Sequence, residues 1–229
     1  MFKQMIVVGL LMVVAVTGCT TPITSASGSV KTVQGSGRIQ RQGRAVSGFH
    51  AVQLRGEGEI RVALGETEGI SLEADDNLLP LIGTRVENGT LIIDLDDREQ
   101  PLNLQPTRPI RFTIAARMLD GFEIMGSGTL VADDVKADRV TVTVHGCGDV
   151  RLTGEAREQI ATITGSGNID TRGLRTAYTR AEIKGSGNIS VWTTDQLDAA
   201  VMAAGNIEYK GQPVVNQTIT GLGTIGSDR

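Results

Sequence analysis

A glycine-centred turn recurs along this chain, and its spacing limits the fold more than any other feature. The unit consists of Gly-x-Gly with one residue and then an aliphatic residue on each side, and eight copies occur between residues 33 and 225. In the last six copies the first glycine position falls at residues 126, 146, 165, 185, 203 and 221, which are 18 to 20 residues apart. This period is too short for helical hairpin repeats or propeller blades, and it suits one coil of a β-solenoid.

The residues of each copy indicate how a coil is built. The copies read VQGSGRI, LRGEGEI, IMGSGTL, VHGCGDV, ITGSGNI, IKGSGNI, VMAAGNI and ITGLGTI, and every outer position is Ile, Val or Leu. A strand enters, the chain bends at glycine, which supplies positive φ and room for close stacking, and a second strand leaves. We expect the flanking aliphatic side chains to fill one interior shared by all coils. The predicted fold class is all-β, a β-solenoid with coils of about 18–21 residues and GxG turns.

Composition agrees with this fold. Glycine supplies 29 of the 229 residues, and fifteen of these lie in the eight turns. Short alternating β-branched segments adjoin the turns, as at 140–144 and 160–163. No proline occurs between Pro109 and Pro213, so a continuous ladder of backbone donors can form over that stretch.

Residues 61–123 lack the repeat but still show strand patterns. Alternating segments occur at 70–72, 91–95 and 110–114, and Asn88-Gly89 is typical of a hairpin turn. We interpret these segments as irregular coils of the same stack. Residues 76–82 form either a short apolar helical turn that covers the solenoid or a loop with inward leucines.

The first residues predict export and lipidation. Lys3 precedes a 12-residue apolar run at 5–16, which is shorter than the roughly 20 residues needed to span a bilayer. The run ends in Val-Thr-Gly-Cys, which resembles a bacterial lipobox with Cys19 as the lipidation site; the alternative is an ordinary signal peptide. Thr20, in place of an aspartate, favours the outer membrane. The expected organisation is a lipoprotein signal peptide at 1–18, a lipidated flexible tether at 19–34 and a β-helix domain at 35–229.

Charge and residue counts exclude several functions. The net charge is −4 with no basic block, so we expect no nucleic-acid partner. Two histidines and two cysteines offer no transition-metal site, no disulfide framework and no redox pair, and we expect no metal and no cofactor. Calcium is less easily excluded because acidic runs occur at 75–76, 94–97 and 133–134, although such runs are usually solvated. Cys147 replaces a small residue between two glycines, which indicates packing rather than a nucleophile.

Several surface residues are candidates for ligand binding. Asn168, Asn188 and Asn206 follow the second glycine in consecutive copies, where they form either a structural ladder of side-chain amides or a polar stripe that binds sugar. The main aromatic residues that could stack on a sugar are Trp192, Tyr178 and Tyr209.

The tandem GSG turns, together with segments 49–54, 77–80 and 86–93, resemble the putative auto-transporter adhesin family, head GIN domain. The resemblance covers about residues 35–225. It implies a right-handed parallel β-helix similar in shape to the pectin-lyase-like superfamily, a role in cell adhesion and no recognised catalytic residues. Ala203-Ala204 and Leu222 depart from the usual turn, which puts the regularity of the last two coils in question.

These observations favour a non-catalytic cell-envelope lipoprotein that presents a rigid β-helical surface for adhesion or for binding a protein or glycan. The alternative is a polysaccharide-cleaving enzyme, which needs two carboxylates about 5 to 9 Å apart, one of them with a raised pKa. The candidate carboxylates near turns are Asp133, Asp134, Asp149 and Asp170. We also expect chains to pair through the C-terminal coil, because an open coil exposes a strand edge; a strictly monomeric protein in sedimentation would contradict this.

Overall fold

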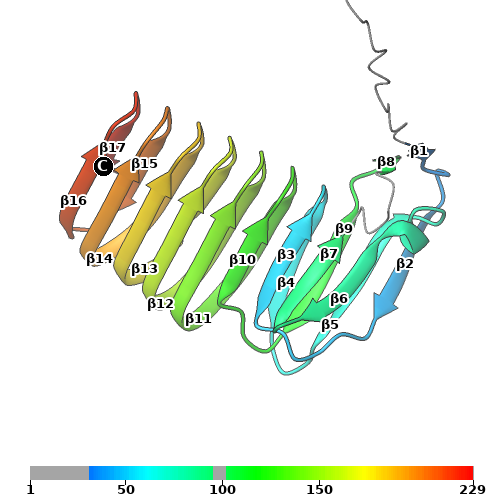
Figure 1. Ribbon diagram of the computed structural model, residues 1–229. Coiled ribbons are helices and arrows are strands. Elements are labelled where there is room, and N and C mark those ends of the chain that lie inside the picture. Colours follow the sequence, from blue (N-terminus) through cyan, green and yellow to red (C-terminus); the bar gives the residue numbers. More distant parts are fainter. Residues whose placement is uncertain (1–30, 95–101, 229) are drawn as a thin grey trace, which may run out of the picture.

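Parallel coils stacked along one axis make up most of the protein (Figure 1). The computed structural model describes residues 31–94 and 102–228. These residues form the β-solenoid that the turn spacing predicts. The expected signal peptide and Cys19 lie outside the described residues, as do the first residues of the tether.

Four long strands form the regular part of the stack, and each occupies the whole stretch between one GxG turn and the next. Each pairs in parallel with the following one, with shifts in register part-way along. Turn residues therefore stack on turn residues, as Asn168 does on Asn188. The strands are β11 (Thr129–Val144), β12 (Asp149–Ile163), β13 (Asn168–Ile183) and β14 (Asn188–Val201).

Three short strands complete the C-terminal part: β15 (Asn206–Lys210), β16 (Val214–Ile219) and β17 (Thr224–Ser227). β15 and β16 both pair with β14, and β17 pairs with β15. Within the described residues no further strand covers β16 or β17, and Val214, Ile219 and Leu222 are 69%, 44% and 93% exposed. Pairing between chains through this coil stays a prediction.

The aliphatic residues that flank the turns fill the interior as expected in the second to seventh copies, where every one from Leu54 to Ile207 is buried. The two terminal copies differ. Val33 and Ile39 of the first copy are only partly buried. In the last copy Ile219 is exposed, because its coil has a neighbour on one side only.

The N-terminal part mixes parallel and antiparallel pairing. Its parallel strands are β3 (Ala51–Arg55), β4 (Glu59–Leu64), β7 (Thr90–Asp94), β9 (Arg111–Ala116) and β10 (Gly121–Ile124). β3 pairs with β7 and β10, and β4 pairs with β9 and β11. The interpretation of residues 61–123 as irregular coils of the stack is therefore correct for β7, β9 and β10.

That interpretation is wrong for two strands that run antiparallel to their neighbours. β5 (Gly69–Asp75) pairs with β9 and with β2 (Ile39–Arg44), and β6 (Gly83–Glu87) pairs with β7. The predicted turn explains β6: Asn88 and Gly89 have φ values of 50° and 77°, and two positive values are what a tight hairpin turn requires. Between β5 and β6, a 3₁₀ helix, η1 (Leu79–Leu81), realises the helical alternative, and Leu78, Leu79 and Ile82 are buried there.

The first repeat copy does not form a turn of the stack. Its entering strand, β1 (Lys31–Gln34), pairs with β8 (Leu102–Gln105) in a separate two-stranded sheet. Its GSG turn instead binds the end of β5 and the residues that follow it. The backbone N–H of Gly37 donates to Asp75 over 2.7 Å, and that of Ser36 donates to Asn77 over 2.9 Å.

Close stacking, rather than positive φ, is why most turns need glycine. Among the turn glycines only Gly37, Gly56 and Gly58 have positive φ, so the expected use of positive φ is wrong for the later copies. In those copies a Cβ would overlap the carbonyl oxygen of the glycine one coil earlier, as with Gly165 and Gly146. The carbonyls of Gly126, Gly146 and Gly165 also accept hydrogen bonds from backbone N–H groups of the next coil.

Candidate functional site

Asn168, Asn188 and Asn206 form the structural ladder. Asn206 donates to the Oδ1 of Asn188 over 3.1 Å, Asn188 donates to Asn168 over 3.0 Å, and Asn168 donates to Asp149 over 2.7 Å. Thr224 continues the row by donating to Asn206 over 2.8 Å. In the ladder each asparagine donates one side-chain N–H and accepts at its Oδ1, and all three asparagines remain exposed.

The aromatic candidates differ in exposure. Trp192 is half-buried, and the ammonium of Lys210 lies 4.1 Å from its ring centroid, so one ring face already holds a cation. Tyr209 is half-buried and packs against the core. Tyr178, by contrast, is 45% exposed. Tyr178 is therefore the aromatic ring of the three with the most area open to a ligand.

A shallow groove of about 460 Å³ gathers four of the residues that the sequence singled out, Asp149, Asn168, Asp170 and Asn188. Arg151 and Arg172 hold Asp170 through contacts of 3.0 and 3.1 Å. Burial raises the pKa of the Asp170 carboxyl, but hydrogen bonds from Arg172 and the charges of both arginines outweigh burial, so this pKa lies below its ordinary value. A general acid needs the opposite shift.

Asp133 and Asp134 do not line this groove. The hydroxyl of Thr153 donates to Asp133 over 3.0 Å and accepts from the backbone N–H of Asp134. Asp134 has a φ of 57° and lies within β11, where the pairing with β12 shifts register between Ala132 and Val135. In residues 31–94 and 102–228 no three His, Cys, Asp or Glu side chains converge as metal ligands would. Residues 95–97 of the acidic run at 94–97 lie outside the described residues.

Asp75, a member of another acidic run, is a buried structural carboxylate. It accepts hydrogen bonds from the backbone N–H groups of Gly37 and Thr107 at 2.7 and 2.9 Å, and from the Thr107 hydroxyl at 2.8 Å. Burial raises the pKa of Asp75, yet these hydrogen bonds outweigh burial and hold the pKa below its ordinary value. The carboxylate thereby joins the first GSG turn to the segment before β9.

We expect Asp75→Asn to lower stability by about 1–2 kcal/mol at neutral pH, because an amide N–H₂ would face backbone donors. The stabilising contribution of Asp75 is complete above the ordinary aspartate pKa and is lost as the pH falls through the lowered folded-state pKa. Urea unfolding followed by circular dichroism should therefore show a gap between wild type and variant that narrows in acid. A gap that is constant with pH would contradict this assignment.

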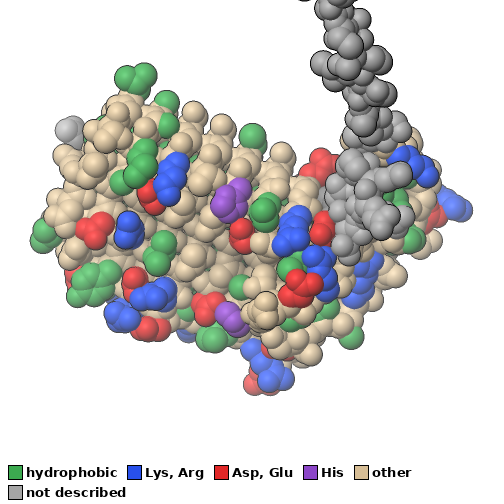
Figure 2. Space-filling model, in the orientation of Figure 1, with side chains coloured by type: hydrophobic (Ala, Val, Ile, Leu, Met, Phe, Trp, Pro, Cys, Tyr) green, Lys and Arg blue, Asp and Glu red, His purple; other side chains and the backbone are tan. Residues whose placement is uncertain are grey.

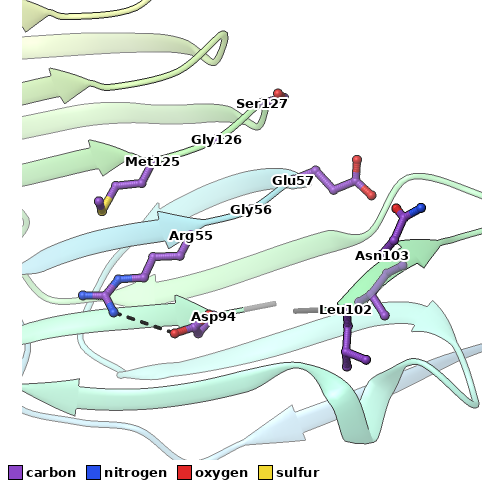
Figure 3. A pocket seen from close by; sticks show the side chains of 10 residues that line it. Arg55, Gly56, Glu57, Asp94, Leu102, Asn103, Met125, Gly126 and Ser127 are labelled. Atoms are coloured by element: carbon purple, nitrogen blue, oxygen red, sulfur yellow. Dashed lines mark ion pairs between the residues drawn. The ribbon is translucent and has the colours of Figure 1, made fainter. Parts of the chain in front are cut away.

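A second pocket, of about 490 Å³, was not predicted from the sequence (Figure 3). Arg55 and Asp94 point toward one another inside it with 3.8 Å between Nη1 and Oδ2, while Glu57 projects away from this pair. Leu102 and Met125 also line the pocket. Its lining comes from four separated segments, 55–57, 94, 102–104 and 125–127. Two of these segments belong to turns of the repeat, but the repeat does not indicate that Asp94 and residues 102–104 lie beside them.

Cys147 is exposed, so the expectation that it packs inside the stack is wrong. Its backbone N–H donates to the carbonyl of Gly126 over 2.9 Å, which holds the residue at the outer edge of the turn. Across the face shown in Figure 2, acidic and basic side chains are interspersed rather than gathered by sign.

Comparison with known proteins assigns the family. Residues 48–213 match the family described as putative auto-transporter adhesin, head GIN domain. The chain belongs to this family. The match covers the solenoid from before β3 to the end of β15 and includes the antiparallel strands β5 and β6. The family resemblance noted in the sequence is thus confirmed.

Several solved structures share the fold. A putative adhesin from Bacteroides fragilis aligns with 86% of this chain and 100% of its own, with a TM-score of 0.71 and 24% identity. A putative lipid binding protein from Parabacteroides distasonis aligns with 87% and 100%, with a TM-score of 0.56 and 22% identity. A putative adhesin from Parabacteroides merdae gives the same coverage, with a TM-score of 0.53 and 20% identity. No curated protein matches the sequence.

Proposed function

We propose that this protein is a lipid-anchored cell-envelope adhesin whose solenoid presents a fixed surface for non-catalytic binding of a protein or glycan. The observation that carries this proposal is that exposed side chains are joined from coil to coil in rows. A surface whose side chains are already held loses less conformational entropy when a partner binds.

Three ion pairs illustrate the rows, each between residues 19 positions apart in the chain. Arg139 contacts Glu158 at 2.9 Å, Arg157 contacts Asp138 at 2.7 Å, and Arg151 contacts Asp170 at 3.0 Å. Exposed ion pairs add little to stability. These ion pairs instead hold exposed side chains in fixed positions along the surface, as the asparagine ladder also does.

The anchoring part of the proposal rests on the N-terminal sequence. Acylation of Cys19 would attach the solenoid to a membrane through chains worth about 0.8 kcal/mol per buried CH₂. Such an anchor requires no membrane-spanning helix, and none of the helices among residues 31–94 and 102–228 is long and apolar enough to cross a membrane. Thr20 favours the outer membrane.

Lipidation is tested at Cys19. We expect the full chain, expressed in a diderm bacterium, to incorporate a labelled fatty acid, and Cys19→Ala to abolish that incorporation.

Surface presentation is tested at the exposed thiol of Cys147. We expect a membrane-impermeant maleimide to label intact cells that carry the wild-type protein, and Cys147→Ser to remove the signal.

Labelling that requires disruption of the outer membrane would place the solenoid inside the cell envelope and refute surface presentation. Release of reducing sugar from polysaccharides by the purified full chain, lost in Asp149→Asn, would refute the non-catalytic part of the proposal.

A further inference from the structure

A groove beside Tyr178 combines an open aromatic ring with polar groups on the two neighbouring coils. Tyr178 lies on β13, in register with Glu158 on β12 and Gln196 on β14. The ring is therefore flanked by a carboxylate on one side and an amide on the other. The groove has a volume of about 420 Å³, and Arg157, Arg180 and Asp198 also line it.

Existing contacts hold most of these polar side chains in place. Glu158 accepts from Arg139 at 2.9 Å, and Arg157 donates twice to Asp138, at 2.7 and 3.0 Å. On the other side, the Nε2 of Gln196 donates to Asp198 over 3.0 Å. The Oε1 of Gln196 therefore remains an open acceptor beside the ring.

Besides the Gln196 amide oxygen, two further side chains have polar groups open to a ligand. Within the described residues the Tyr178 hydroxyl makes no hydrogen bond, and the Arg180 guanidinium makes no ion pair, although Arg180 lies in register with Asp198 on β14. An open phenol, an open guanidinium and an open amide oxygen supply both donors and acceptors. The open ring supplies a flat apolar face between them.

The combination matches one class of ligand. A pyranose presents C–H groups on its faces and hydroxyl groups around its rim, so it needs a flat apolar surface bordered by donors and acceptors. The charges that line the groove balance, with Arg157 and Arg180 against Glu158 and Asp198, so nothing selects a polyanion. A protein partner would need a broader apolar area, and Tyr178 is the one large exposed hydrophobic side chain lining this groove.

We propose that the groove around Tyr178 binds a neutral saccharide, with the Tyr178 ring stacked on a sugar face and Glu158 and Gln196 bonded to its hydroxyl groups. This inference rests on the proposed binding function and specifies the ligand class and the place. Among the three aromatic candidates it selects Tyr178 rather than Trp192, because Lys210 covers one face of the Trp192 ring.

Calorimetric titration of the full chain in detergent tests the proposal. The probes are tetramers of cello-, xylo-, malto- and chito-oligosaccharides, with oligogalacturonate as the acidic comparison. We expect one neutral probe to bind, Tyr178→Ala to weaken binding about tenfold or more, and Tyr178→Phe to stay within about threefold. Met202→Ala, which removes an apolar side chain of similar exposure, 48%, should leave affinity unchanged. Thermal unfolding of each variant verifies that it is folded.

Several results would overturn this inference. Binding that survives Tyr178→Ala, or that Asn188→Ala abolishes in its place, would put the saccharide elsewhere on the solenoid. Stronger binding of oligogalacturonate would refute a neutral ligand, and failure of every probe would refute the groove as a saccharide site. None of these outcomes would refute presentation of the solenoid at the cell surface, because maleimide labelling of Cys147 measures that separately.

Discussion

Replacing Ile183 with aspartate should unfold the C-terminal coils. Ile183 is fully buried and lies between Ile163 and Val201 of the adjacent coils. The variant loses about 1.5–3 kcal/mol of side-chain burial and places an unpartnered carboxyl group in the interior, which costs several kcal/mol more. A total near 5 kcal/mol or above approaches the whole stability of a typical domain, about 5–15 kcal/mol.

The matched control is Ile219→Asp, which makes the same change at the same repeat position one coil beyond Val201. Because Ile219 is 44% exposed, its aspartate stays hydrated, and we expect a loss below about 1 kcal/mol. Thermal unfolding by circular dichroism ranks the two variants, and hydrogen exchange locates the melted coils. Equal unfolding temperatures for Ile183→Asp and wild type would refute the shared interior.

The spacing of the turns predicted the regular part of the fold because spacing determines register in a solenoid. Copies one period apart must stack, so the burial of Val144, Ile163 and Ile183 and the ladder from Asn168 to Asn206 both follow from counting residues. The hairpin turn at Asn88-Gly89 was equally predictable, because a turn with two positive φ values strongly favours Asn and Gly at its central positions.

The first GSG copy shows where counting fails. The same string that stacks on its neighbour elsewhere binds Asp75 here, and a Cβ at Gly35 would overlap that carboxylate. This contact joins residues 38 positions apart, and local sequence does not encode it. The antiparallel pairing of β5 with β2 adjoins this contact, because Ile39 lies opposite Asp75.

The exposure of the aromatic candidates could not be predicted for a related reason. Aromatic residue type was visible in the sequence, but exposure is set by side chains on adjacent coils. Lys210 covers Trp192, whereas Glu158 and Gln196 leave Tyr178 open. The buried polar network of the interior was also not predicted. One part pairs Gln159 with Thr171, and the other joins Thr176, Thr179 and Thr193.

Replacing Gly165 with valine should break the stack at its middle. A Cβ at Gly165 would overlap the carbonyl oxygen of Gly146, and that oxygen accepts the 2.9 Å hydrogen bond from Ser166. The overlap involves backbone on both sides, so rotation of a side chain cannot relieve it. Since overpacking typically costs about 1–3 kcal/mol even where side chains can adjust, we expect a loss above about 3 kcal/mol.

Gly43→Val is the matched control, because a Cβ at Gly43 meets no atom within 4 Å and valine favours the strand β2 in which Gly43 lies. Denaturant unfolding should show a normal midpoint for Gly43→Val and a strongly lowered one for Gly165→Val. The copy with Ala203 shows the limit of tolerance: its period is 18 residues, and the hydrogen bond from Ala204 to Gly185 lengthens to 3.2 Å. Equal midpoints for Gly165→Val and Gly43→Val would mean that the coils separate freely at the turns, and close approach could then no longer explain the glycines.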